Sequence, residues 1–437
     1  MGTAAVKGWV RRRPLLTLFV LSLLFAFTLQ AAVTLPIIRS LAQQVDAGTA
    51  AADGNSRLRV LLNAGKATSA KYLVVDFDDP SMAGFGYRST IPRGPLARAV
   101  EASINAHARA IVVDVDLGWD DPVESATLLT TLRHAETAKV PVFLVREPVR
   151  DEDRGVWALP PSALDELVEQ LSYVRYATAV SADDEDHSRR RMAPAVKVCD
   201  GSHGDILLGA HVSAGVLLWE LPVERALAIV DQASHPRTDC AGSGATDLRI
   251  AAGDTQLFLS AKDGGPRVDY VVTPATASTR GVTVFSGKLF ADHGEGYDGA
   301  AFAGRMVLIG SSSRLGRDLH STPVGDMPGI FILLNAIEQM GRKVVPREDA
   351  FWPPMLLTGL SSCLTFGVWL FLVTRFSGLN GEIRSEIIKT AVGVLWLVAS
   401  WIAFSRSSLL AYAAPQYLLS VFLILADSLH RPGSRHP

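Results

Sequence analysis

Cysteine is scarce in this sequence, and neither sign of charge is in excess. The 437 residues contain three cysteines and a net charge of −2. The run from Cys199 to His203 lacks the cysteines shortly upstream that an iron–sulfur cluster needs. No basic excess exists to neutralise phosphates, so we expect no nucleic-acid partner.

Catalytic and nucleotide-binding signatures are incomplete as well. Residues 310–316 follow an apolar run but lack the Gly-Lys-Ser/Thr ending of a phosphate loop, and residues 84–86 lack the third glycine of a dinucleotide fingerprint. No G-x-S-x-G elbow marks a nucleophile among residues 311–313. We therefore expect no catalytic activity and no cofactor.

Long apolar runs lie only towards the two ends of the chain. Residues 15–38 are long enough to cross a bilayer, and the basic segment 1–14 before them predicts a cytoplasmic N-terminus. A cleaved signal peptide is the alternative, although the run is longer than a usual signal core. Three more spans are predicted at residues 351–373, 390–404 and 409–427, all within 351–428, and are followed by a cytoplasmic tail at 429–437.

Basic residues in the connection between the second and third spans favour one topology. Arg375, Arg384 and Lys389 place that connection in the cytoplasm. Residues 39–350 then form an extracytoplasmic (periplasmic) domain of a multi-pass protein of the plasma (inner) membrane. Cys199 and Cys240 would lie in an oxidising compartment, either bridged or as free thiols, whereas Cys363 falls inside a span.

Within the domain, short apolar runs alternate with helical patterns. Residues 72–77, 110–115 and 140–145 read as buried strands, and Pro122 opens a helix that reaches about Ala138. This order predicts an α/β fold with a mostly parallel sheet flanked by helices. Further predictions are helices at 162–174, 212–231 (broken at Pro222) and 329–340, strands at 269–273, 282–285 and 306–309, and a solvated hairpin or loop at 183–191.

Acidic residues follow the first two predicted strands. Asp78, Asp79 and Asp116 would lie at the carboxyl ends of two neighbouring strands, where open α/β sheets bind ligands. Such carboxylates are candidate ligands of Mg²⁺ or Ca²⁺; alternatively, they cap turns and pair with arginines. The candidate ligand-binding residues are Asp78, Asp79, Ser81, Arg93, Asp116, Ser311, Ser312, Asp318 and Thr322.

Two segments resemble a known family. The strand VVDFDDPSM with the following IPRGPLARAV, and the closing stretch RMVLIGSSSRLGRDLHSTPVGDMPGIFILLNAIEQM, are similar to the beginning and end of type-two CHASE domains (cyclase/histidine-kinase-associated sensory extracellular). The arrangement of one span before the domain and three after it is also similar.

The resemblance implies an extracytoplasmic sensor. Relatives carry a kinase or cyclase output module after the last span, whereas here about ten residues follow it, so we expect a separate signalling partner and a possible homodimer. A structural subunit of a cell-envelope complex and a metal-dependent extracytoplasmic enzyme are the alternatives. Helix 329–340 directly precedes the second predicted span, so we expect movement of the loop at 311–318 to reach the membrane.

Overall fold

The structure, a computed structural model, describes residues 60, 68 and 71–343, the last range with gaps at 87–89, 116, 118–121, 152–155, 184–187, 201–202, 235–239, 241–243, 253–254, 262–263, 292–298 and 315–317. These residues belong to one compact unit, Ser56–Val345. Among them, no helix is long and apolar enough to cross a bilayer. The four predicted spans lie outside the described residues, so they stay predictions.

A six-stranded parallel sheet forms the centre of this unit. The strand order is β14-β1-β15-β2-β3-β6, and every neighbouring pair is parallel. The strands are β1 (Tyr72–Asp76), β2 (Ala110–Val113), β3 (Val142–Val145), β6 (Val174–Ala177), β14 (Val282–Ser286) and β15 (Met306–Gly310). The predicted α/β fold with a mostly parallel sheet is confirmed.

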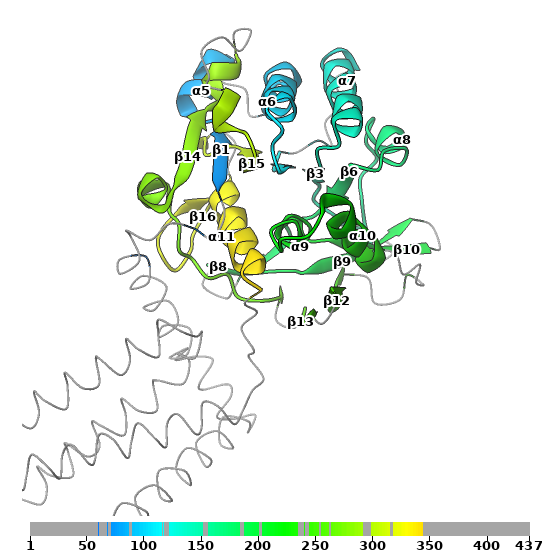
Figure 1. Ribbon diagram of the computed structural model, residues 1–437. Helices are drawn as coiled ribbons and strands as arrows, with labels where there is room; N and C mark the ends of the chain where they lie inside the picture. Colours follow the sequence, from blue (N-terminus) through cyan, green and yellow to red (C-terminus); the bar gives the residue numbers. More distant parts are fainter. Residues whose placement is uncertain are drawn as a thin grey trace, which may run out of the picture. The chain divides into compact units, whose positions relative to one another are not determined.

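The sheet is buried on both faces because helices cover each of them. Side chains alternate along a strand, so Tyr72 and Val74 join one apolar cluster while Leu73 and Val75 join the other. Helices α5 (Asp79–Gly84), α6 (Arg93–Asn105), α7 (Pro122–Ala138) and α8 (Asp165–Val168) cover one face, and α9 (Ala210–Val216), α10 (Val223–Ser234) and α11 (Gly329–Gly341) cover the other (Figure 1).

Smaller elements surround this core. A three-stranded antiparallel sheet joins β9 (Ala195–Asp200), β10 (His203–Leu208) and β11 (Gly244–Ala245). Four two-stranded ribbons are β4 (Val149–Asp151) with β5 (Val156–Ala158), β7 (Ser181–Asp183) with β8 (Arg189–Met192), β12 (Leu248–Ala252) with β13 (Thr255–Leu259), and β16 (Leu319–His320) with β17 (Met327–Pro328). The β7–β8 pair confirms the hairpin predicted for the charged segment. The short 3-10 helices are η2 (Pro274–Thr276), η3 (Ser278–Arg280), η4 (Gly287–Phe290) and η5 (Gly299–Ala301).

The helix predicted at 162–174 is wrong for most of its length. Only the four residues of α8 are helical, and Val174 already begins strand β6. The Asp165 carboxylate accepts hydrogen bonds from the Ser162 amide (2.8 Å), from Arg146 Nη1 (2.7 Å) and from the Tyr176 hydroxyl (2.7 Å). These bonds tie the segment to the ends of β3 and β6.

The strand predicted at 269–273 is also wrong. The amides of Val271 and Val272 donate to Asn335 Oδ1 of α11, at 2.7 and 2.8 Å, instead of to a neighbouring strand. Asn335 Nδ2 in turn donates to the Val272 carbonyl at 2.8 Å. A side chain therefore supplies the hydrogen bonds that a sheet would otherwise supply. The break at Pro222, now between α9 and α10, and the helices beginning at Pro122 and Gly329 are confirmed.

Candidate functional site

The carboxyl end of β15 is a topological switch point. Strands β1 and β2 lead into helices on the α6 side of the sheet, whereas β15 lies between them and leads into α11 on the opposite side (Figure 1). Open α/β sheets bind ligands where neighbouring connections leave in opposite directions. The prediction that β1 and β2 are neighbours is wrong, because the last strand of the chain is inserted between them.

Three residues line up across this switch point on the α11 side. Asp76 of β1 pairs with Gly310 of β15, and Asp114 follows β2 immediately, with its amide donating to the Ile309 carbonyl at 2.7 Å. A side chain at Gly310 would collide with Ile330, since an added Cβ would lie 2.8 Å from Ile330 Cδ1. Glycine at the centre of the row therefore lets the first turn of α11 approach the sheet.

Asp76 is held by the loop that follows β15. Its two carboxylate oxygens accept hydrogen bonds from the Ser312 amide (2.8 Å) and the Ser312 hydroxyl (2.6 Å). Burial raises the pKa of Asp76, and the two bonds from Ser312 partly oppose the rise. The sequence predicts Ser312 as a residue of this site but does not predict Asp76, because Asp76 reads as part of the strand.

The predicted residues Asp78, Asp79 and Ser81 belong to an aspartate–serine network. Asp78 caps α5 by accepting from the Ser81 amide at 3.0 Å and the Ser81 hydroxyl at 2.5 Å, and it also accepts from Ser286 Oγ at 3.1 Å. Asp79 accepts from Ser313 Oγ (2.8 Å) and the Arg314 amide (2.9 Å), and these bonds lower the pKa of its exposed carboxyl group.

Ser311 completes this network. Its hydroxyl donates to the Phe77 carbonyl at 2.7 Å and accepts from the Ser313 amide at 3.1 Å. The network thus joins the turn after β1 to the loop after β15. Capping and turn closure, the alternative to cation binding, account for these contacts of Asp78 and Asp79.

A second acidic group lies around Asp114. The pKa of Asp114 is raised to about 8, and burial is the largest cause. The nearby carboxylates of Asp318 and Glu147 also raise this pKa, whereas the positive charge of Arg189 lowers it. An acid with this pKa is mostly protonated at neutral pH and is a hydrogen-bond donor. Asp114 lies two residues before the predicted Asp116, so the strand ends earlier than the sequence suggested.

Asp318, one of the predicted ligand-binding residues, lies at the beginning of α11. Its carbonyl accepts from the Gly329 amide at 2.9 Å, its carboxylate contacts the Cα side of Gly329, and His320 Nε2 lies 2.7 Å from its Oδ1. A carboxylate is favoured there by the positive end of the helix dipole. We call Asp76, Asp114 and Asp318 the switch-point acids.

Other predicted residues have different roles. Thr322 closes the turn between β16 and β17 by hydrogen bonds with Gly325, and Arg93, 2% exposed, is the first residue of α6. Asp116 lies outside the described residues. Among the described residues, no group of three or more His, Cys, Asp or Glu side chains is placed to hold a metal ion. The site of Asp78, Asp79 and Asp116 therefore stays a prediction.

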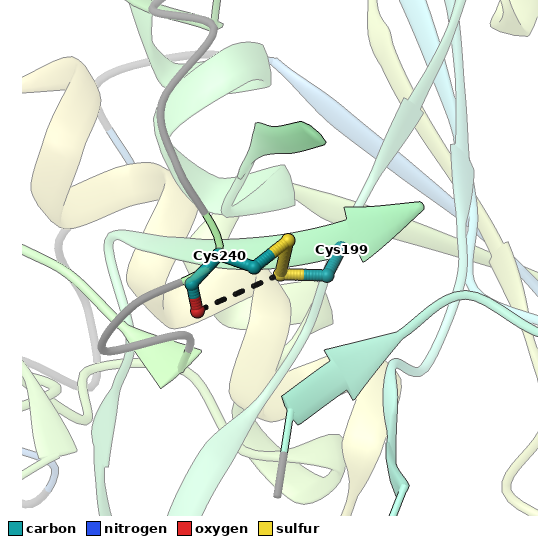
Figure 2. The surroundings of a disulfide bond; sticks show 2 residues. All are labelled: Cys199 and Cys240. Atoms are coloured by element: carbon teal, nitrogen blue, oxygen red, sulfur yellow. Dashed lines mark hydrogen bonds between the residues drawn. A yellow bond between two sulfur atoms is a disulfide. The ribbon is translucent and has the colours of Figure 1, made fainter. Parts of the chain in front are cut away.

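Cys199 and Cys240 form a disulfide. Cys199 lies on β9, Cys240 lies between α10 and β11, and their Cα atoms are 5.7 Å apart (Figure 2). The Cys199 sulfur also lies 3.9 Å from the Cys240 carbonyl oxygen. Of the two alternatives that the sequence left open, the bridge is confirmed.

These observations define a class: a three-layer α/β domain with its polar residues gathered at the switch point of a parallel sheet. Comparison with protein families then gives the particular family. A family model described as the CHASE2 domain matches residues 18–374, most of the chain, so the chain belongs to the CHASE2 family of extracellular sensory domains. No curated protein and no solved structure matches the chain.

Proposed function

We propose that the chain is a membrane-anchored extracytoplasmic sensor that binds its ligand at the switch point and signals through a separate protein. Membership of the CHASE2 family supports the sensory role. The observation that carries the ligand site is the raised pKa of Asp114, which is caused by burial and then by the nearby carboxylate of Asp318 at the beginning of α11. A protonated acid beside a carboxylate offers both a donor and an acceptor, which favours a polar ligand.

The route from this site towards the membrane is α11. The helix begins beside Asp318 and ends at Gly341, shortly before the predicted second span at 351–373. Its first turn packs on Gly310, and its middle is bonded to the 271–272 segment through Asn335. These contacts hold both the first turn and the middle of α11, so a ligand that displaces Asp318 would move the helix as a whole.

The disulfide supports the extracytoplasmic location, because structural disulfides form and persist in oxidising compartments. The four predicted spans place the protein in the plasma (inner) membrane with both termini in the cytoplasm. The incomplete catalytic motifs support a protein without its own catalytic activity. A separate partner is the proposed receiver of a signal that α11 carries towards the predicted second span.

Purification of the tagged full chain from native membranes, with identification of the proteins that accompany it, tests this proposal. We expect a kinase or cyclase at a constant ratio to the tagged chain, and we expect the Asp318→Asn variant to recover it in changed amount. Recovery of envelope structural proteins only, in equal amount from both forms, would support the alternative of an assembly subunit and contradict the sensor.

A further inference from the structure

His211 is a buried histidine whose ring has no hydrogen-bond partner in the part of the chain that the structure describes. The residue is 5% exposed, and both Nδ1 and Nε2 are unpaired. Buried imidazoles usually donate one N–H and accept at the other nitrogen, so an orphaned ring stands out. The ring lies against the Cα of Gly209, where an added Cβ would be 2.6 Å from His211 Cε1.

The ring borders a cavity of about 20 Å³ that is mostly apolar. Met192 of β8, Leu259 of β13, and Ala336 and Met340 of α11 form much of its wall. This space is enough for about one water molecule. One water cannot replace the hydration shell of an imidazolium, so a charged ring needs the cavity to open.

The cavity lies where α9 packs against the C-terminal half of α11. Gly215 of α9 touches the Met340 side chain, since an added Cβ would be 2.5 Å from Met340 Cγ. Trp219 Nε1, just after α9, donates to the Met340 carbonyl at 3.0 Å. Opening around His211 would thus loosen the end of the helix that leads towards the predicted second span.

Charged groups on the surrounding elements do not neutralise this ring. Arg267 is the charged residue that lines the cavity. Glu338 of α11 is bonded to the Tyr72 hydroxyl and to Arg342, while Arg191 of β8 donates to the Gly265 carbonyl. Burial alone lowers the pKa of His211 to about 4, with no contribution from a nearby charge.

We propose that His211 is a proton-binding site through which acidification outside the cell loosens the packing of α9 against the C-terminal half of α11. The closed form keeps the imidazole neutral in its cavity, and the open form exposes it to water, where it accepts a proton. The stimulus is then the proton itself, and this inference does not depend on the ligand site at the switch point.

The size of the effect follows from linkage. An imidazole with a pKa of about 4 when closed and about 6.5 when exposed makes the open form about tenfold more populated at pH 5.5 than at pH 7.5. The response begins as the pH falls through the pKa of the exposed ring, continues down to the pKa of about 4 of the closed ring, and is reversible.

Hydrogen exchange measured by mass spectrometry on the full chain in lipid nanodiscs tests the proposal. After correction for the intrinsic pH dependence of exchange, we expect peptides covering residues 336–341 to exchange about tenfold faster at pH 5.5 than at pH 7.5. Peptides from α6, on the other face of the sheet, serve as the internal reference.

Two variants isolate the residue. His211→Leu, which fills the site and cannot charge, should remove the pH response, whereas His134→Gln, at a half-exposed histidine paired with Glu101, should keep it. If His211→Leu does not fold, His211→Phe serves the same purpose. Equal corrected exchange of the unmodified chain at both pH values, or a full response in a folded His211 variant, would overturn the proposal.

Discussion

At the scale of single residues, the acids at the carboxyl edge of the sheet differ in what surrounds them. Asp79 is exposed and accepts two hydrogen bonds, which favour its charged form. Asp114 is desolvated by the surrounding protein and lies near two other carboxylates, and both effects favour its neutral form. The same residue type thus meets opposite electrostatic conditions within one site.

Asp114→Asn should stabilise the protein at alkaline pH. The pKa of Asp114 is above its unfolded value of about 3.9, so its contribution to stability is fully present below that value and is lost as the pH rises through about 8. Asparagine imitates the neutral acid at every pH. We expect urea unfolding of the full chain in detergent micelles to show a gain of at least about 1 kcal/mol at pH 8 and little change at pH 4.

Asp79→Asn is the matched control, with the opposite sign. The pKa of Asp79 is lowered in the folded protein, so its contribution is present above the unfolded pKa and is lost as the pH falls through the folded value. This variant should be less stable than the unmodified chain at pH 7. A loss of stability in Asp114→Asn at pH 8 would contradict the assignment of Asp114 as a mostly neutral acid.

The sequence predicted part of this site and missed its centre for an identifiable reason. The runs at 74–76 and 112–114 both read VVD, and both end on an acid that faces α11. Because both acids read as part of a buried strand, the sequence pattern favours Asp78 and Asp116 as the site residues instead. The repeated triplet is the signal that places Asp76 and Asp114 at equivalent positions.

At the scale of elements, α11 is the part on which the account depends most. Asn335, which is completely buried, replaces a missing strand by bonding both Val271 and Val272. Asn335→Ala should therefore destabilise the domain by about 2–4 kcal/mol, because it leaves buried backbone groups without partners. Thermal unfolding followed by circular dichroism measures this loss.

Gln339→Ala, one turn later on α11, provides the comparison. Gln339 is only partly buried, accepts from the Asp269 amide at 2.8 Å and donates to the Arg267 carbonyl at 2.9 Å. Water can reach these groups more easily, so the loss should be smaller, at about 1 kcal/mol. Equal losses in the two variants would show that Asn335 has no special part in holding the 271–272 segment.

The disulfide makes a second prediction at this scale. It closes a loop with a sequence separation of 41 residues, and replacing Cys199 and Cys240 together by serine should cost about 3–4 kcal/mol. Cys363→Ser, outside the described residues, is the control and should leave the stability of the domain unchanged. A double variant as stable as the unmodified chain would mean that β9 and Cys240 are held together without the bond.

Elements with strong local signals were predictable, and their arrangement was not. Apolar runs identified β1, β2, β3 and β15, and Pro122 identified the beginning of α7. The short β6 reads VRYA, and its arginine and tyrosine are only partly buried, so its sequence lacks a strand pattern. The insertion of β15 between β1 and β2 depends on contacts between residues more than 190 positions apart, which local patterns do not encode.

At the scale of the whole molecule, the protein has a confirmed family and fold and a proposed membrane topology. The CHASE2 match and the parallel sheet define a sensory domain, while the spans and the partner come from sequence patterns. The extracytoplasmic location connects the sensory domain with the proposed topology, because the proposed sensing role requires the domain to face the exterior. The disulfide makes this location measurable in the native protein.

Counting the free thiols that the protein has in living cells tests the central claim, the extracytoplasmic location of the domain, most directly. Cells are quenched in acid, and the denatured full chain is treated with a maleimide reagent that adds a resolvable mass to each free thiol, with and without prior reduction. An extracytoplasmic domain predicts one modified thiol, Cys363, before reduction and three after it. Three modified thiols before reduction would place Cys199 and Cys240 in a reducing compartment and contradict the account of an extracytoplasmic sensor.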